Sequence, residues 1–184
     1  MRHLFLHRRW TGRLVSSGPF QPEAFAHRLA THLKRWVVLY LVFAALAIWF
    51  HAYYAFGLNA SPSLPYRLFL IHKSEMPGRG DFVAFRWAGG GPYPAGVTFV
   101  KVLAGIPGDE VSRDAQGFFV NGTPVGTPKP IGRQGQPLEP GPTGRIPEGR
   151  YYVQAAHPDS LDSRYQLTGW IQASQIVGRA RALF

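Results

Sequence analysis

A long run without charge is the feature that most constrains this chain of 184 residues. Between Arg35 and Arg67 there is no Asp, Glu, Lys or Arg, and the most apolar part of this stretch is Trp36–Phe56. A helix of this length rises roughly 31 Å, which matches a hydrocarbon core of ~30 Å. Trp and Tyr residues near both ends of the run suit the two membrane interfaces. The sequence therefore predicts one transmembrane helix over residues 36–56.

Two other interpretations of this run fit the sequence less well. The length of the run, its lack of a polar face and its flanking charges together disfavour a buried helix of a soluble protein. A cleaved signal peptide would have a shorter positively charged region and a shorter apolar segment than those found here. We therefore expect the span to be retained.

The distribution of charge predicts the orientation of the span. Residues 1–35 hold seven of the 20 basic residues and one of the ten acidic residues, so they carry +6 of the net charge of +10. Basic segments beside a span tend to stay in the cytoplasm, where they face anionic lipid. We expect residues 1–35 to form a basic cytoplasmic arm, whose part 22–35 is either a short interfacial helix or disordered. This placement explains the charge without nucleic-acid binding, so the expected partner of the arm is the lipid bilayer.

Residues 57–184 are expected outside the cytoplasm, and their pattern predicts a mainly β domain. Asn121-Gly122 between two apolar runs predicts a hairpin with a two-residue type I′ turn. Seven prolines and seven glycines make up half of residues 122–149, which predicts an extended loop or ordered meander there. Short runs rich in β-branched and aromatic residues, separated by turn-forming residues, lie at 66–72, 81–87, 98–104, 151–157 and 176–184. The expected fold is a compact β-barrel-like or sandwich domain preceded by one N-terminal transmembrane helix.

Lys101 interrupts one of these apolar strands. Strand alternation places its side chain on the same face as Phe99 and Leu103. Poor solvation disfavours the charged form, so we expect the pKa of Lys101 to fall from about 10.4 toward neutrality. A neutral lysine can act as a general base. The alternative is an edge-strand lysine whose stem packs while its ammonium reaches water.

Ser61 and Ser63 follow the predicted span almost directly. Residues two apart on an extended backbone point the same way, so both hydroxyls can face one pocket. One hydroxyl could then attack a carbonyl while the other donates to the developing oxyanion. Serines between a span and a strand are also common as loop residues and helix-end caps, and this alternative stays open.

Other arrangements that could carry chemistry are less well supported. Asp162 and Arg164 lie two residues apart and predict an ion pair that closes a loop. A Ser-His-Asp triad would need His72 or His157, and the spacing does not exclude it. The chain has no cysteine, which excludes a disulfide scaffold and a thiolate nucleophile. The one pair of histidines four residues apart lies in the basic arm without a carboxylate cluster, so no metal site is expected.

Three ordered segments together resemble the type I signal peptidase family, which is built on a serine–lysine dyad. Lys101-Val-Leu-Ala-Gly-Ile-Pro-Gly-Asp109 is similar to the lysine box of that family. Ser160-Leu-Asp-Ser-Arg164 is similar to its C-terminal box. Asp81-Phe-Val resembles a strand start common in these enzymes, and the serine segment at 59–67 follows the anchor. The resemblance covers about residues 57–184 and the span before them.

This resemblance implies a serine endopeptidase that cleaves exported precursor proteins and needs no cofactor. It implies a bacterial inner-membrane enzyme with a single span, a cytoplasmic N-terminus and a periplasmic catalytic domain. The extended substrates of the family imply an apolar groove lined by strands 81–87 and 98–104. It implies that Ser63 is the nucleophile, Lys101 the general base and Ser61 an oxyanion donor. It also implies that Ser160 orients the base and that Asp162 and Arg164 support the site.

The serine segment departs from the usual family pattern. Signal peptidases usually have Ser-x-Ser-Met-x-Pro-Thr, whereas Pro65 follows Ser63 by two residues here and no threonine follows. The segment is more similar to the conjugative-transfer (TraF-type) branch, with Arg67 replacing its glycine and Phe69 replacing its tyrosine. This implies a dedicated secretion or conjugation substrate, such as a pilin-like precursor, and leaves hydrolysis and transpeptidation both open. The alternative function is a non-catalytic, membrane-tethered β scaffold of a secretion complex.

Overall fold

The computed structural model describes residues 22–59, 61 and 63–184. The chain divides into two units, Met1–Ala45 and Leu46–Phe184, and all strands of the described residues lie in the second. Residues 1–21 of the predicted basic arm lie outside the described residues.

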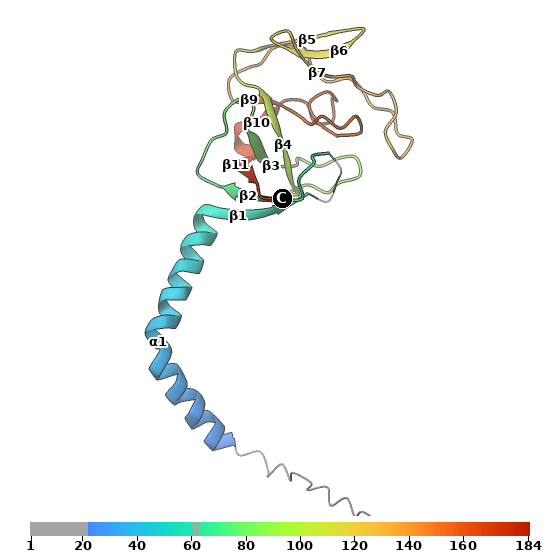
Figure 1. Cartoon of the computed structure of the whole chain (residues 1–184). Coiled ribbons are helices and arrows are strands. Elements are labelled where there is room, and N and C mark those ends of the chain that lie inside the picture. The colour runs from blue at the N-terminus through green and yellow to red at the C-terminus, as the bar shows by residue number, and fades with distance from the viewer. Residues whose placement is uncertain (1–21, 60, 62) are drawn as a thin grey trace, which may run out of the picture. The chain divides into compact units, whose positions relative to one another are not determined.

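The first element, α1, is a continuous helix over Pro22–Tyr53 (Figure 1). It contains most of the apolar run and is long and apolar enough to cross a membrane. Residues 22–35, for which a short interfacial helix or disorder was expected, belong to this same helix. The predicted span extended to Phe56, but the helix ends three residues earlier, at Tyr53.

Contacts at the end of α1 explain why the helix stops there. The last carbonyls of a helix have no partner within it. One of them, the carbonyl of His51, accepts a hydrogen bond from the Lys73 ammonium at 2.5 Å. The ring of the next residue after the helix, Tyr54, stacks on His72 with ring centroids 4.8 Å apart. These contacts start strand β1 (Tyr54–Leu58), whose residues suit a strand as well as a helix.

The main sheet contains seven antiparallel strands in the order β1-β2-β11-β3-β4-β9-β10. Each of the five strand regions predicted from the sequence overlaps one of them. Besides β1, the strands are β2 (Leu68–His72), β3 (Phe82–Arg86), β4 (Thr98–Gly105), β9 (Arg150–Gln154), β10 (Ile171–Gln172) and β11 (Ile176–Ala182).

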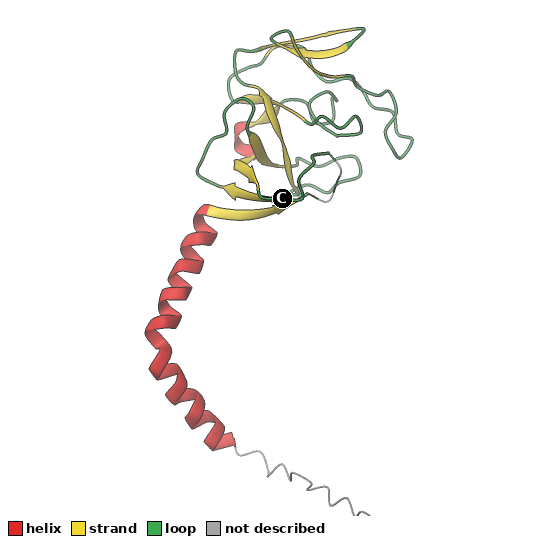
Figure 2. Ribbon diagram, in the orientation of Figure 1, coloured by secondary structure: helices red, strands yellow, loops and turns green. Residues whose placement is uncertain are grey.

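A second sheet of four strands has the order β7-β6-β5-β8. Figure 2 draws the strands of both sheets in yellow and the loops between them in green. Asn121 and Gly122 connect two of its strands, and their φ angles of 48° and 77° confirm the predicted turn with two positive φ values. The bounds are β5 (Glu110–Asp114), β6 (Gly117–Val120), β7 (Thr123–Gly126) and β8 (Gly144–Arg145). The mainly β fold class is therefore confirmed.

The main sheet is buried on both faces because it curls around its own side chains. Val83 and Phe85 of β3 pack with Leu103 in one core cluster, whereas Ala84 between them packs with Phe69 in another. A third cluster combines apolar residues of β5, β6, β7 and β9 and joins the small sheet to the main one. Strand β4 pairs with β3 on one side and β9 on the other, so it is held firmly within the sheet.

Candidate active site

Lys101 lies in the middle of β4 and is only 5% exposed. It is directly opposite Val83 of β3, and its side chain is on the face of buried Leu103, which confirms the predicted alternation. Burial lowers the pKa of Lys101 to about 8; the negative charge of Asp162 opposes this shift, and the positive charge of Arg164 adds to it. Since β4 lies between β3 and β9 and Lys101 is buried, the structure contradicts the alternative of an edge-strand lysine.

The segment after β9 supplies the partner of this lysine. Lys101 Nζ donates a hydrogen bond to Ser160 Oγ at 2.7 Å. The Arg164 guanidinium donates to both oxygens of Asp162, through Nε and Nη2, each at 2.8 Å, so the predicted ion pair is confirmed. Arg164 Nη2 also lies within 3.4 Å of the carbonyl oxygens of residues 155, 157 and 160. The buried pair thus fixes the backbone that presents Ser160.

The hydroxyls of Ser61 and Ser63 lie 2.8 Å apart. Ser61 Oγ donates a hydrogen bond to Asn59 Oδ1 at 3.0 Å. Because a hydroxyl has a single proton, Ser61 accepts from Ser63 in this network. The proton of Ser63 therefore points toward Ser61 in this structure.

Asn59 is a residue of the site whose importance the sequence analysis missed. Its Oδ1 accepts from the backbone N–H of Ser61 at 3.2 Å, and its amide donates to the carbonyls of Leu64 and Tyr66 at 3.3 and 3.0 Å. Asn59 thereby folds the segment that carries both serines. The available signal was an Asn two residues before a Ser, which favours an Asx turn.

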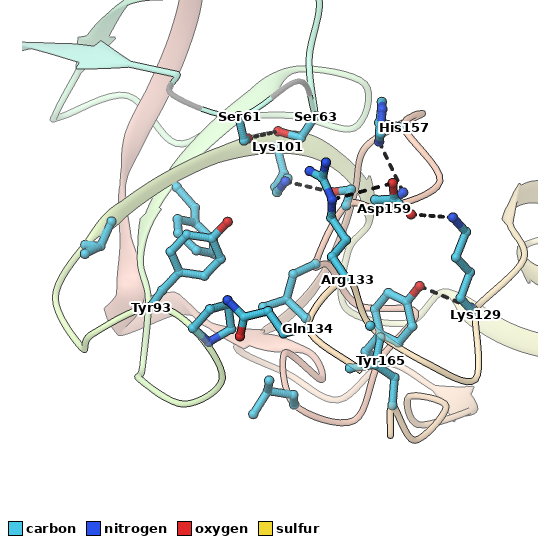
Figure 3. Close-up of a pocket in the computed structure, with 18 of the residues that line it drawn as sticks. Ser61, Ser63, Tyr93, Lys101, Lys129, Arg133, Gln134, His157, Asp159 and Tyr165 are labelled. Carbon is cyan, nitrogen blue, oxygen red and sulfur yellow. Dashed lines mark hydrogen bonds and ion pairs between the residues drawn. The ribbon is translucent and has the colours of Figure 1, made fainter. Parts of the chain in front are cut away.

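A pocket of about 590 Å³ contains both groups of residues (Figure 3). Ser61, Ser63, Lys101 and Ser160 all line it, and Figure 3 shows Lys101 and the two serines at the same side of it. Among the residues that the structure describes, Lys101 and Ser63 share no hydrogen bond: the amine donates to Ser160, and the Ser63 hydroxyl donates to Ser61. The Ser61–Ser63 hydroxyl pair and the buried amine of Lys101 therefore line the same pocket.

The walls of the pocket differ in part from the expected groove. Residues 97–101 of β4 and its approach line the pocket, as expected, but no residue of 81–87 does. The remaining walls come from residues within 92–93, 129–138 and 157–167, together with Leu58, Asn59, Ser61 and Ser63. The first of these is a turn and the second belongs to the Pro/Gly-rich stretch, so neither has the strand periodicity on which the prediction relied.

Neither candidate histidine forms a Ser-His-Asp triad. His157 lines the pocket, but its Nδ1 accepts a hydrogen bond from the backbone N–H of Asp159 at 3.1 Å. The carboxylate of Asp159 binds Lys129 rather than this imidazole. His72 pairs with Glu75 at 2.9 Å and does not line the pocket. Across residues 22–59, 61 and 63–184, no three His, Cys, Asp or Glu side chains group closely enough to hold a metal ion.

Asp109, the last residue of the lysine box, supports a turn rather than the pocket. Its carboxylate accepts hydrogen bonds from Arg79 Nη2 at 2.7 Å, from Asn121 Nδ2 at 2.8 Å and from the Ile106 backbone N–H at 2.8 Å. These hydrogen bonds, above all the one from Arg79, lower the pKa of Asp109 to about 2. The lysine box therefore connects the buried amine of Lys101 on β4 to a hydrogen-bonded turn directly before β5, the first strand of the small sheet.

Comparison with known proteins identifies the family of this chain. A profile of the family described as signal peptidase, peptidase S26, matches residues 29–184. Among solved structures, a signal peptidase I from Enterococcus faecalis V583 is 25% identical, with a TM-score of 0.39; the match covers 60% of this chain and 98% of that one. A search of curated proteins found no match. Since the family profile spans most of the sequence, the chain belongs to the S26 signal peptidase family and is a serine hydrolase.

Proposed function

We propose that this chain is a membrane-anchored endopeptidase that cleaves exported precursor proteins with Ser63 as nucleophile and Lys101 as general base. The observation that carries the proposal is the buried amine of Lys101, which lines the same pocket as the Ser61–Ser63 hydroxyl pair. A lysine with a pKa of about 8 is partly neutral near pH 7, and only the neutral amine can accept a proton.

In the proposed reaction, the Lys101 amine removes the hydroxyl proton of Ser63 while Ser63 Oγ attacks the scissile carbonyl carbon. Collapse of the tetrahedral intermediate breaks the C–N bond, and the ammonium returns its proton to the leaving amine. Water, deprotonated by the same amine, then hydrolyses the ester and frees Ser63. The first step requires the Ser63 hydroxyl to rotate away from Ser61 and toward Lys101.

The remaining residues have supporting roles in this proposal. The backbone N–H of Ser63 and the hydroxyl of Ser61 would bind the oxyanion, and such donors contribute about 3–4 kcal/mol each in other proteases. For this, the Ser61 hydroxyl must leave Asn59 Oδ1. Ser160 orients the amine through its 2.7 Å hydrogen bond, and the Asp162–Arg164 pair holds the segment that carries Ser160.

The proposed location is the bacterial inner membrane, with a single span, residues 1–35 in the cytoplasm and residues 57–184 in the periplasm. The apolar character of α1 supports a membrane anchor, and the excess of basic residues before it supports this orientation. A dedicated substrate in secretion or conjugation, such as a pilin-like precursor, is supported by the TraF-like segment that begins at Ser63.

Cleavage by the full-length protein in detergent tests this function. We expect exported precursor proteins to be cut by the unaltered enzyme and to stay intact with Ser63→Ala or Lys101→Ala, while both variants remain folded by circular dichroism. Ser174→Ala, at an exposed position in a 3-10 helix, and Lys34→Ala, on exposed α1, are matched controls that should cleave normally. Undiminished cleavage by the Ser63→Ala protein would refute the proposed nucleophile.

A further inference from the structure

Part of the Pro/Gly-rich stretch forms a wall of the proposed active-site pocket. We call residues 129–138 the wall loop. The backbone N–H of Gly132 donates to the Gln136 carbonyl at 2.8 Å, and Ile131 and Pro137 form a β-bridge, so the loop is closed on itself. Six of its side chains line the pocket, those of Lys129, Ile131, Arg133, Gln134, Gln136 and Leu138.

Both ends of the wall loop are tied to the segment that carries Ser160. At one end, the backbone N–H of Lys129 donates to the Tyr165 hydroxyl at 3.1 Å. Just beyond the other end, the backbone N–H of Gly141 donates to the Arg164 carbonyl at 2.8 Å. The wall loop and the hydrogen-bond partner of Lys101 therefore share one anchor, which keeps the loop in register with the dyad.

The pocket carries more positive than negative charge. Its lining includes three cationic side chains, from Lys101, Lys129 and Arg133, but a single carboxylate, that of Asp159. Lys129 Nζ is bound to one oxygen of Asp159, while Arg133 approaches the other oxygen only through Nε, at 3.9 Å. Within the described part of the chain, the two Nη groups of Arg133 have no hydrogen-bond partner. An arginine with free donors thus faces a pocket whose one carboxylate is already engaged.

Figure 3 shows Arg133 reaching from the wall loop into the pocket, with its guanidinium directed toward the side where Lys101 and Ser63 lie. A guanidinium binds a carboxylate through two parallel N–H donors, a geometry that an ammonium does not offer. We propose that Arg133 is a specificity-determining residue that favours substrates with an acidic side chain in the segment bound across the pocket. This inference rests on the proposed function of the same site.

The expected preference is modest because Arg133 is accessible to solvent. Its side chain is 68% exposed, and exposed ion pairs contribute little in high dielectric. We expect a peptide with one Glu to bind about three- to fivefold more tightly than the same peptide with Gln. Salt at about 1 M should remove most of this difference, because the Debye length falls to about 3 Å.

Binding to the uncleaving Ser63→Ala protein measures the preference separately from catalysis. The probes are alanine-rich decapeptides, acetylated and amidated at their termini, with a single Glu, Gln or Lys at each position in turn. We expect the Glu peptide to bind most tightly at one or more positions, the advantage to vanish with Arg133→Gln, and Lys to replace Glu as the favoured residue with Arg133→Glu. A second set with a free C-terminal carboxylate distinguishes recognition of an acidic side chain from recognition of a chain end.

Arg113→Glu is the matched control, since Arg113 is an exposed arginine on β5 that does not line this pocket. This variant should keep the preference for Glu. Equal affinity for the Glu and Gln peptides, a preference that survives Arg133→Glu, or no measurable binding of any peptide would each overturn the inference. Cleavage that needs Ser63 but ignores substrate charge would overturn the inference about Arg133 and leave the proposed function intact. Selective binding of the Glu peptide without any cleavage would contradict the proposed function and leave the charge preference of Arg133 intact.

Discussion

Burial of Lys101 has two opposing effects, one on the stability of the protein and one on the proposed chemistry. Its ammonium is buried in a face built from Val83 and Leu103, where the charged form is poorly solvated. The same burial leaves a fraction of the amine neutral near pH 7, which the proposed chemistry requires. The depressed pKa of Lys101 that the proposed catalysis requires therefore also lowers the stability of the fold.

Lys101→Met should stabilise the protein while it abolishes cleavage. The pKa of Lys101 is about 8 in the folded protein and 10.5 for an ordinary lysine, so the unfolded chain binds more protons between these two values. Stability of the unaltered protein therefore rises with pH from about 8 to 10.5, and the burial penalty is full below pH 8. At pH 7 the Met variant should gain about 2 kcal/mol, less than the pKa shift alone would give because the bond to Ser160 is lost.

Denaturation in detergent at pH 7 and again near pH 10 measures this gain. The advantage of the Met variant should be large at the first pH and small at the second. Lys34→Met, at an exposed position of α1, should show no such dependence. A Met variant that is less stable than the unaltered protein at pH 7 would contradict the burial penalty.

At the scale of elements, the segment after β9 organises the pocket. Its buried Asp162–Arg164 pair supports the carbonyls around Ser160, and the backbone carbonyl of Arg164 accepts a hydrogen bond from the backbone N–H of Gly141 beyond the wall loop. Loss of one partner leaves the other charge buried without compensation, which costs far more than loss of an exposed ion pair.

Asp162→Ala should therefore lower the free energy of unfolding by about 3–5 kcal/mol. Chemical denaturation in detergent measures the change. Asp114→Ala is the control, because Asp114 is exposed at the end of β5 and its side chain accepts one backbone hydrogen bond, so its loss should cost about 1 kcal/mol. Similar losses for the two variants would show that the buried pair does not hold the segment.

The elements also show which parts of the structure the sequence could predict. Alternation of apolar residues located β3 and β4 and placed Lys101 on the inner face, because strand period alone decides this. The strand β1 was hidden in the apolar run, since its start depends on stacking between Tyr54 and His72, residues far apart in the sequence. Arg133 was missed for a related reason: the wall loop has no period, and its place in the pocket depends on tertiary hydrogen bonds.

At the scale of the whole molecule, the proposed orientation makes the two ends of the chain accessible from opposite sides of the membrane. The protein contains no cysteine, so single cysteines report accessibility without background labelling. Ser174→Cys lies at an exposed position of the β domain, and Ser17→Cys lies in the basic arm.

An impermeant maleimide added to intact spheroplasts should label the Ser174→Cys protein and leave the Ser17→Cys protein unlabelled. After lysis both should react, which shows that each thiol is able to do so. Labelling of Ser17→Cys in intact spheroplasts, with protection of Ser174→Cys, would reverse the proposed orientation.

The central claim is that a neutral Lys101 amine activates the hydroxyl of Ser63, and the pH dependence of kcat/KM for precursor cleavage tests it most directly. This parameter reports the essential base of the free enzyme. We predict that kcat/KM rises about tenfold per pH unit below the pKa and levels off above about pH 8, where the amine is neutral. A rate that is already constant at pH 6, or substantial cleavage by the Lys101→Met protein, would contradict this mechanism.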